Sequence, residues 1–368
     1  MTSRSASARS RAILAGTGFL LLAPLLWAAA PPAKYDAALA RARASVVRVV
    51  ALHPVRDEAS GDVAPRPRAH VASGVVMDRD GRILTTATGI VGCIEIRVRT
   101  ASGREFPANL LGLDPTTDLA LIRIPAGSAP PFVRAPAASM GVGAPVFAVA
   151  YGRTPSQEMG TIRWRYDEPL RSLLQMTTEI HPGNSGGAAV DAEGRLVGVL
   201  IGGLAEVHAA DSLQREASER GGTFAVPVSD AALVMSDLQR YGGVPRGFLG
   251  VSIQQGLVDD PGHPGAPAVM GVTLSDVVTN GPAWKAGMRS GDLVVAVNGQ
   301  QVNSPDELMS RIMAQRPGTS AELLWIRAEK EYRAKVSLTA TPDSVLASQL
   351  EAAGAAARAR AQEAGQPH

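Results

Sequence analysis

The sequence predicts a mainly β protein in which a barrel or sandwich domain is followed by a smaller α+β domain. Between residues 45 and 228, short β-branched runs alternate with turn signals and show hardly any 3.6-residue periodicity, as in all-β domains. After Pro227 the pattern changes to a helix and then to a mixed unit of strands with one capped helix. The chain has 368 residues, which is enough for two domains that each bury a core.

The N-terminal segment is typical of exported proteins. Arg4, Arg9 and Arg11 precede an apolar run over residues 13–30, which is the layout of a secretory signal. We expect residues 1–30 to be a signal peptide or, if they remain uncleaved, an N-terminal membrane anchor. Either outcome exports the chain from the cytoplasm to the periplasm or cell envelope.

Composition argues against several classes of partner. The formal net charge is +2 and both signs are scattered along the chain, so no basic block predicts nucleic-acid binding. We expect no cofactor and no metal ion. Cys93 is the only cysteine and has no internal disulfide partner; in the alternating run 93–98 it is expected to be a half-buried, inert strand thiol.

The first domain is predicted to span residues 40–228. Its strand-like runs are residues 46–51, 73–77, 83–86, 94–98, 119–124, 145–150, 160–164, 196–201 and 223–226. Between such runs, Asp80-Gly81, Ser102-Gly103 and Glu193-Gly194 supply the glycine that a tight turn needs. We therefore expect a hairpin at each of these dipeptides.

A helical linker is predicted over residues 229–245. Ser229 can cap a helix whose apolar positions share one side and which ends at Gly242-Gly243. These apolar positions are Leu233, Val234, Met235, Leu238 and Tyr241.

The second domain is predicted to span residues 246–340. Its strands are expected around Val251, Val272, Val294 and Leu323. Asn298-Gly299 is a hairpin signal, and Ser304-Pro305-Asp306-Glu307 is a capping box with proline at the first helical position. The residues that this helix turns inward are Leu308, Ile312 and Met313. The Ala-rich tail, residues 341–368, has little to bury and is expected to be a frayed helix or disordered.

One glycine-rich run points to chemistry. Gly183-Asn184-Ser185-Gly186-Gly187 follows the strand-like residues 174–178. Glycines on both sides of a serine let the hydroxyl project while backbone N–H groups converge on one point, as in an oxyanion hole. Ser185 is the candidate nucleophile, and the N–H groups of Gly183 and Ser185 are the candidate oxyanion donors. Taken alone, the run also fits a glycine-rich surface turn.

The context of this run carries a family resemblance. The motifs are, in order, Ser73-Gly74-Val75-Val76, Asp80-Gly81-Arg82-Ile83-Leu84-Thr85, Asp114-Pro115-Thr116-Thr117-Asp118-Leu119, Thr223-Phe224-Ala225-Val226-Pro227, Arg246-Gly247-Phe248-Leu249-Gly250-Val251, Gly281-Pro282-Ala283, Gly287-Met288 and Gly291-Asp292. From about residue 44 to residue 339 the chain resembles the HtrA (high-temperature-requirement, Deg-type) trypsin-like serine proteases, which carry a C-terminal PDZ domain. The resemblance implies a trypsin-like double β-barrel with the site in the cleft between the barrels, followed by a smaller α+β PDZ domain.

The resemblance also implies a triad in chain order His, Asp, Ser, of which one member is replaced. Asp118 matches the family's aspartate and Ser185 its nucleophile. The family's histidine lies in a Leu-Thr-x-x-His segment, and this alignment places Thr88 at the histidine position. Threonine has no basic lone pair of suitable pKa, so it cannot take the serine proton. Loss of the base costs about 10⁶-fold in turnover in subtilisin.

Few residues could replace the missing base. The lysines all lie outside the predicted barrels, at Lys34, Lys285, Lys330 and Lys335. His70, just before the run 73–77, approaches the primed side of the cleft in this fold and is the best available substitute. His181 would belong to the wall of the site. The alternative for both histidines is that they are polar loop residues with no catalytic role.

The PDZ-like segment predicts peptide binding. The resemblance implies that Phe248, Leu249, Gly250 and Val251 present backbone N–H groups to a chain-terminal carboxylate, while the peptide adds as a strand beside residues 251–253. Leu308 and Ile312 would line the apolar pocket that receives the peptide. The alternative is a domain that only packs on the barrel or on another subunit, because this binding mode needs an open strand edge.

The sequence thus predicts an HtrA-like pseudoprotease of the cell envelope that binds unfolded polypeptides or protein C-termini without cutting them. Two alternatives stay open: an active endopeptidase for misfolded envelope proteins that uses a non-standard base, and a regulatory subunit in a mixed oligomer with an active homologue. Trimers are common in the family, so a homotrimer is a further expectation. Membrane contact is expected only through residues 13–30, if these remain uncleaved.

Overall fold

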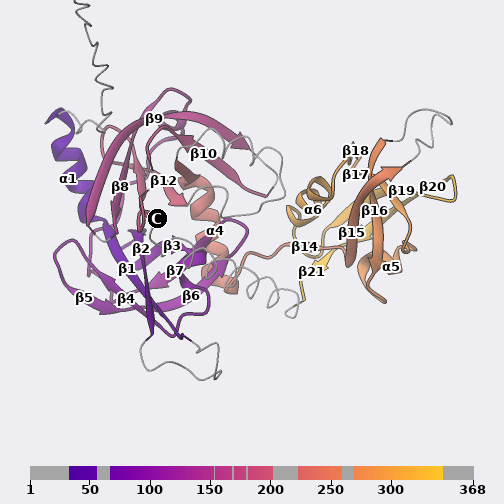
Figure 1. The fold of residues 1–368 in the computed structure, drawn as a ribbon, viewed down its shortest axis with the longest axis horizontal. Coiled ribbons are helices and arrows are strands. Elements are labelled where there is room, and N and C mark those ends of the chain that lie inside the picture. Colours follow the sequence, from indigo (N-terminus) through magenta and orange to yellow (C-terminus); the bar gives the residue numbers. More distant parts are fainter. Residues whose placement is uncertain are drawn as a thin grey trace, which may run out of the picture.

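The computed structural model describes residues 33–55, 67–152, 154–167, 170–179, 181–201, 223–258 and 269–342. These residues form a larger and a smaller lobe (Figure 1). The predicted signal or anchor, residues 1–30, and nearly all of the predicted tail lie outside the described residues. Of the helices in the described ranges, none combines the length and the apolar character needed to cross a membrane.

The larger lobe begins with a seven-stranded sheet in the order β5-β4-β1-β2-β3-β7-β6. Its strands are β1 (Val46–His53), β2 (Arg68–Val76), β3 (Arg82–Thr86), β4 (Glu95–Arg99), β5 (Glu105–Pro107), β6 (Asn109–Asp114) and β7 (Leu119–Arg123). The pairings are antiparallel. Gly81 and Gly103 have φ of 80° and 85° at the β2–β3 and β4–β5 turns, which confirms two of the predicted hairpins.

A closed barrel completes this lobe, in the order β10-β13-β12-β11-β8-β9. Its strands are β8 (Pro145–Tyr151), β9 (Pro155–Asp167), β10 (Ser172–Met176), β11 (Ala188–Val190), β12 (Leu196–Ile201) and β13 (Thr223–Pro227). Short helices flank the sheets: η1 (Ala33–Tyr35), α1 (Asp36–Ala44), α2 (Ala87–Ile90) and η2 (Ala137–Met140). The third predicted hairpin, β11–β12, is confirmed by Gly194 with φ of 76°.

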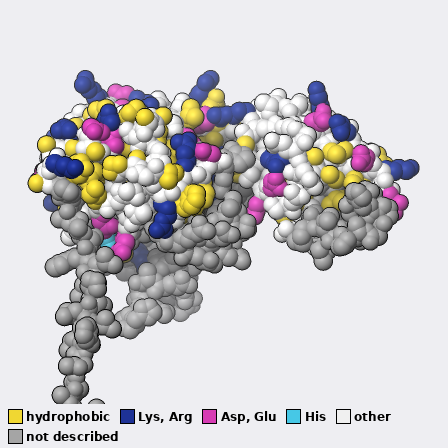
Figure 2. Space-filling view, turned by 90° about the horizontal axis from the view of Figure 1, so that it is seen from above, with side chains coloured by type: hydrophobic (Ala, Val, Ile, Leu, Met, Phe, Trp, Pro, Cys, Tyr) yellow, Lys and Arg dark blue, Asp and Glu magenta, His cyan; other side chains and the backbone are white. Residues whose placement is uncertain are grey.

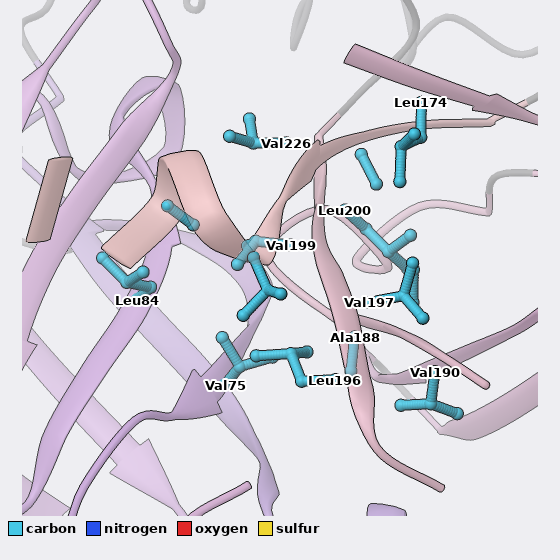
Figure 3. Close-up of a cluster of buried hydrophobic side chains, with 14 of the residues drawn as sticks. Val75, Leu84, Leu174, Ala188, Val190, Leu196, Val197, Val199, Leu200 and Val226 are labelled. Atoms are coloured by element: carbon cyan, nitrogen blue, oxygen red, sulfur yellow. The ribbon is translucent and has the colours of Figure 1, made fainter. Parts of the chain in front are cut away.

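One apolar core joins the two sheets of the larger lobe. Val75 and Leu84 from the first sheet belong to the same buried cluster as Ala188, Leu196 and Val199 from the barrel (Figure 3). All of these side chains have 1 % exposure or less. Because close-packed interiors resist deformation, this shared core fixes the ends of β2 and β3 relative to the turn before β11.

The predicted linker helix forms part of this core. α4 (Val228–Tyr241) follows Pro227 directly, so Ser229 is not its cap and instead donates its hydroxyl to Asp230 at 2.9 Å. The buried stripe consists of Val228, Ala231, Val234, Met235 and Leu238. The single apolar side predicted for this helix is wrong in part, because Leu233 is 68 % exposed and lies off this stripe. Tyr241, the last helical residue, continues the stripe three residues after Leu238 but is 55 % exposed. Gly242 ends the helix with φ of 73°.

The smaller lobe has a sheet in the order β15-β16-β17-β19-β20, with β18 paired to β17 and β14 to β21. Its elements are β14 (Gly247–Phe248), β15 (Val251–Val258), β16 (Val269–Val277), α5 (Pro282–Lys285), β17 (Leu293–Val297), β18 (Gln300–Gln301), α6 (Pro305–Met313), β19 (Ser320–Arg327), β20 (Lys330–Ser337) and β21 (Thr339–Ala340). The predicted capping bond is confirmed, because Glu307 N–H donates to Ser304 Oγ at 3.1 Å. The β17–β18 hairpin is also confirmed, with φ of 52° at Asn298 and 75° at Gly299.

Among the described residues, two ion pairs link the lobes. Arg246 contacts Asp114 at 2.6 Å, with both side chains at least nine-tenths buried, and Arg316 contacts Asp237 at 2.7 Å. Elsewhere, acidic and basic side chains are interspersed over both lobes on the face shown in Figure 2. This mixture agrees with the near-neutral net charge of +2.

Candidate functional site

The Ser185 loop connects β10 to β11. Gly183 and Gly186 have φ of 93° and 85°, a region that favours glycine. A Cβ atom on Gly186 would also stand 2.1 Å from the Ser73 carbonyl oxygen. The loop closes through bonds from Asn184 N–H to the His181 carbonyl, at 2.9 Å, and from Gly186 N–H to the Leu200 carbonyl, at 2.7 Å. This tight, glycine-dependent turn leaves Ser185 partly exposed.

Ser73 of β2 holds the Ser185 loop from the first sheet. Its N–H donates to the Ser185 carbonyl and its hydroxyl to the Gly183 carbonyl, both at 2.8 Å. The same hydroxyl accepts the Tyr151 N–H at 2.9 Å, and Thr85 Oγ1 donates to the Ser73 carbonyl at 2.7 Å. Sequence reasoning used Ser73 and Thr85 only as family motifs and missed this anchoring role, which depends on the approach of two separate sheets.

The two predicted oxyanion donors are available in the structure. Within the described ranges, the N–H groups of Gly183 and Ser185 donate to no protein acceptor. A peptide N–H that makes no internal bond next to a partly exposed serine is ready to receive a carbonyl oxygen. The assignment of these groups as an oxyanion hole stays a prediction.

Asp118 and Thr88 meet because their strands are neighbours. Thr86 at the end of β3 pairs with Leu119 at the start of β7, so the residues just beyond these ends lie side by side. Thr88 Oγ1 donates to Asp118 Oδ1 at 2.7 Å, and Thr88 N–H donates to the same oxygen at 2.8 Å. Asp118 is 3 % exposed and has φ of 55°. The carboxylate is therefore held rigidly against the first turn of α2.

This arrangement changes what the carboxylate can do. In a serine-protease triad the aspartate accepts a hydrogen bond from an imidazole and holds it in the tautomer that takes the serine proton. Here the Asp118 oxygen accepts a bond from a threonine hydroxyl instead. The hydroxyl has no basic nitrogen, so Thr88 cannot do the work of that imidazole.

His70 lies on β2 beside the residue that follows Thr88. A Cβ atom on Gly89 would stand 2.9 Å from His70 Cδ2 and 3.0 Å from Nε2, so the ring packs directly on the Gly89 backbone. His53 Nε2 bonds to the Gly89 carbonyl at 3.0 Å. Although His70 keeps some exposed surface, desolvation lowers its pKa, and the charges of His53 and Arg68 lower it further. The lowered pKa favours the neutral form of the His70 imidazole, which packs against α2.

The sequence did not predict the hydrogen-bond partner of His181 or the position of Cys93 outside a strand. The imidazole of His181 forms a short hydrogen bond with the Glu158 carboxylate, a partner that the sequence did not indicate. Cys93 lies between α2 and β4, so its predicted place in a strand is wrong; β4 begins at Glu95 and Ile94 is 67 % exposed. Burial raises the pKa of the Cys93 thiol, which keeps it in the unreactive form.

The predicted carboxylate-binding loop lies between β14 and β15. The carbonyls of Leu249 and Gly250 accept bonds from Ala283 and Val278 N–H, at 3.0 and 2.9 Å. In the part of the chain that the structure describes, the N–H groups of Leu249 and Gly250 donate to no protein acceptor. Gly250 has φ of 76°. Successive free N–H groups in such a turn form a concavity suited to an anion.

A strand edge is open next to this loop. β15, which starts at Val251, is the last strand on one side of its sheet and has no described neighbour there. Leu308 and Ile312 of α6 project into the core of the lobe with 0 % and 2 % exposure, which leaves little of either side chain for a peptide to contact. Their assignment to a peptide pocket stays a prediction.

Comparison with known proteins agrees with this geometry. A trypsin-like peptidase domain model matches residues 72–199 and a PDZ domain model matches residues 273–327. A probable periplasmic serine endoprotease, DegP-like, from Halomonas elongata is 30 % identical over 302 residues, covering 78 % of this chain and 62 % of that protein. Its counterpart in Chlamydia muridarum is 30 % identical over 291 residues, covering 76 % of this chain and 56 % of that protein. The chain thus spans about three fifths of the length of these relatives.

Solved structures give the same result. The HtrA-type protease AlgW with decapeptide superposes with a TM-score of 0.64 at 26 % identity, covering 84 % of this chain and 99 % of that one. The serine endoprotease from Yersinia pestis superposes with a TM-score of 0.62 at 27 % identity, covering 85 % and 100 %. The predicted mainly β fold class, a trypsin-like domain followed by a PDZ domain, is confirmed. The chain is a homologue of the HtrA-type, DegP-like serine proteases, built from a trypsin-like peptidase domain and a PDZ domain.

Proposed function

We propose that this chain is a catalytically impaired HtrA-like protein of the periplasm that binds peptide segments or protein C-termini without cutting them. The observation that carries the proposal is the 2.7 Å bond from Thr88 Oγ1 to Asp118 Oδ1. This bond supports the proposal, because a hydroxyl that binds the carboxylate would stand where the triad needs an imidazole. The envelope location rests on the predicted export segment and on relatives that are named periplasmic.

Peptide binding is supported at two places. The free N–H groups of Gly183 and Ser185 can donate to a peptide carbonyl oxygen in the larger lobe. In the smaller lobe, the free N–H groups at Leu249 and Gly250 stand beside the open edge of β15. A chain-terminal carboxylate held by such a loop, with the peptide added as an extra strand, is an established recognition mode.

A fluorophosphonate probe tests the impaired site, because stable labelling of a serine requires an activated hydroxyl. We expect no label on Ser185 in the purified chain at neutral pH. Intact mass spectrometry measures the result, with Ser185→Ala as the background control. Labelling that disappears in Ser185→Ala would contradict the proposal.

A second candidate function, an active endopeptidase with a relocated base, is favoured by one observation. The neutral His70 ring packs against Gly89, one residue from the position where the base is missing. The same probe separates the two candidates. Labelling of Ser185 that is lost in His70→Ala would identify His70 as the base, whereas an unlabelled wild-type chain excludes it.

For the smaller lobe, we expect peptides that end in a free hydrophobic carboxylate to bind more tightly than the same peptides with an amidated end. Amidation removes the charge that the N–H groups of Leu249 and Gly250 would hold, and hydrogen bonds to a charged group contribute about 1.5–3 kcal/mol. The expected loss is therefore about tenfold or more in Kd, measured by titration calorimetry. Equal binding of the two forms would show that the loop does not bind a carboxylate.

A further inference from the structure

We propose that Glu158 of β9 is a positioning residue for the Ser185 loop, which it holds through Glu179 and His181. The inference rests on the proposed function in one respect, because it takes this loop to be the part of the cleft that receives a peptide carbonyl. The structural part of the inference needs no bound peptide.

The two oxygens of Glu158 hold two points of the chain just before the Ser185 loop. Oε2 accepts the Glu179 N–H at 3.0 Å, and Oε1 forms a short hydrogen bond with His181 Nε2. The Glu158 side chain is only 13 % exposed, whereas that of His181 is 50 % exposed. A carboxylate that spans a backbone donor and a side-chain donor restrains both the path of the segment and the direction of the imidazole.

The restraint reaches Ser185 through a short series of bonds. The His181 carbonyl accepts the Asn184 N–H at 2.9 Å, which closes the turn one residue before the serine. Ser156 lies two residues before Glu158, on the same face of β9, and donates to Asn184 Oδ1 at 3.1 Å. Asn184 is 5 % exposed. β9 therefore holds the loop from the barrel side, as Ser73 does from the first sheet.

Amide hydrogen exchange at the hydrogen-bonded N–H groups of Asn184 and Gly186 in the full chain, corrected for intrinsic exchange rates, tests the proposal. Glu158→Ala should lower the protection of these two groups about tenfold, because Glu179 N–H and the His181 imidazole both lose their partner. Glu158→Gln, which keeps an acceptor oxygen for Glu179 N–H, should restore most of the protection.

Asp167→Asn is the matched control, since this carboxylate lies on the same strand and pairs with Arg165. Protection of residues 196–201, in β12, reports whether each variant is folded, and Glu158→Asp, whose shorter side chain cannot span both donors, replaces Glu158→Ala if the latter is not. Loop exchange in Glu158→Ala equal to that in Asp167→Asn would overturn the positioning role. Exchange in Glu158→Gln as fast as in Glu158→Ala would overturn it as well. Neither result depends on probe labelling or peptide binding, so failure here and failure of the proposed function remain distinguishable.

Discussion

Thr88→His is expected to make Ser185 react with a fluorophosphonate probe and to give the chain measurable peptidase activity. The histidine would take over the Asp118 Oδ1 atom that Thr88 Oγ1 now occupies, while the backbone bond from residue 88 to the same oxygen, at 2.8 Å, holds the main chain in place. The free N–H groups of Gly183 and Ser185 are already available to a substrate carbonyl. General-base catalysis contributes about 10²–10⁴-fold, and the gain should fall in this range because placement errors near 1 Å cost about 10²-fold.

The pH profile gives this prediction a specific signature. The new base works only when neutral, so the recovered activity should fall as the pH drops through the imidazole range. The His70 ring packs on Gly89, next to the position of the new side chain, and competes with it for space. We therefore expect Thr88→His combined with His70→Ala to be at least as active as Thr88→His alone.

Two controls show whether the activity of Thr88→His comes from the restored site. The activity must disappear when Ser185→Ala is added to the Thr88→His background. If Thr88→His melts like the wild-type chain and its Ser185 stays unreactive, the site differs from a working protease in more than the histidine. That outcome would contradict the account of a site that lacks only its base.

The fold could be predicted from the sequence wherever local chemistry decides it. Gly81, Gly103 and Gly194 adopt positive φ at the expected turns, and Ser304 caps the expected helix. The errors arise where packing decides. Leu233 is apolar but exposed because it lies off the face of α4 that buries Val234 and Leu238, whereas Tyr241 is exposed at the C-terminal end of that face. Periodicity alone does not fix which arc of a helix faces the core.

The sequence motifs predicted that Thr88 and Asp118 lie together, but they did not predict which residues anchor the Ser185 loop. The aligned motifs put Thr88 and Asp118 in one site, and the β3–β7 pairing brings them into contact. Ser73, Thr85 and Glu158 were not predicted as anchors of the Ser185 loop. Their bonds span separate strands that meet only after folding, so no local pattern marks them.

The most direct test of the central claim is hydrolysis of unfolded casein by the purified wild-type chain. Without a base, turnover in a serine hydrolase falls by about 10⁶-fold, or roughly 8 kcal/mol of barrier, and the oxyanion hole recovers only a small part of this. Thr88, which donates to Asp118 at 2.7 Å, has no basic nitrogen that could serve as a substitute. We predict that the rate of casein cleavage equals that of the Ser185→Ala variant measured in parallel. Cleavage by the wild-type chain that Ser185→Ala abolishes would contradict the claim that this site binds without cutting.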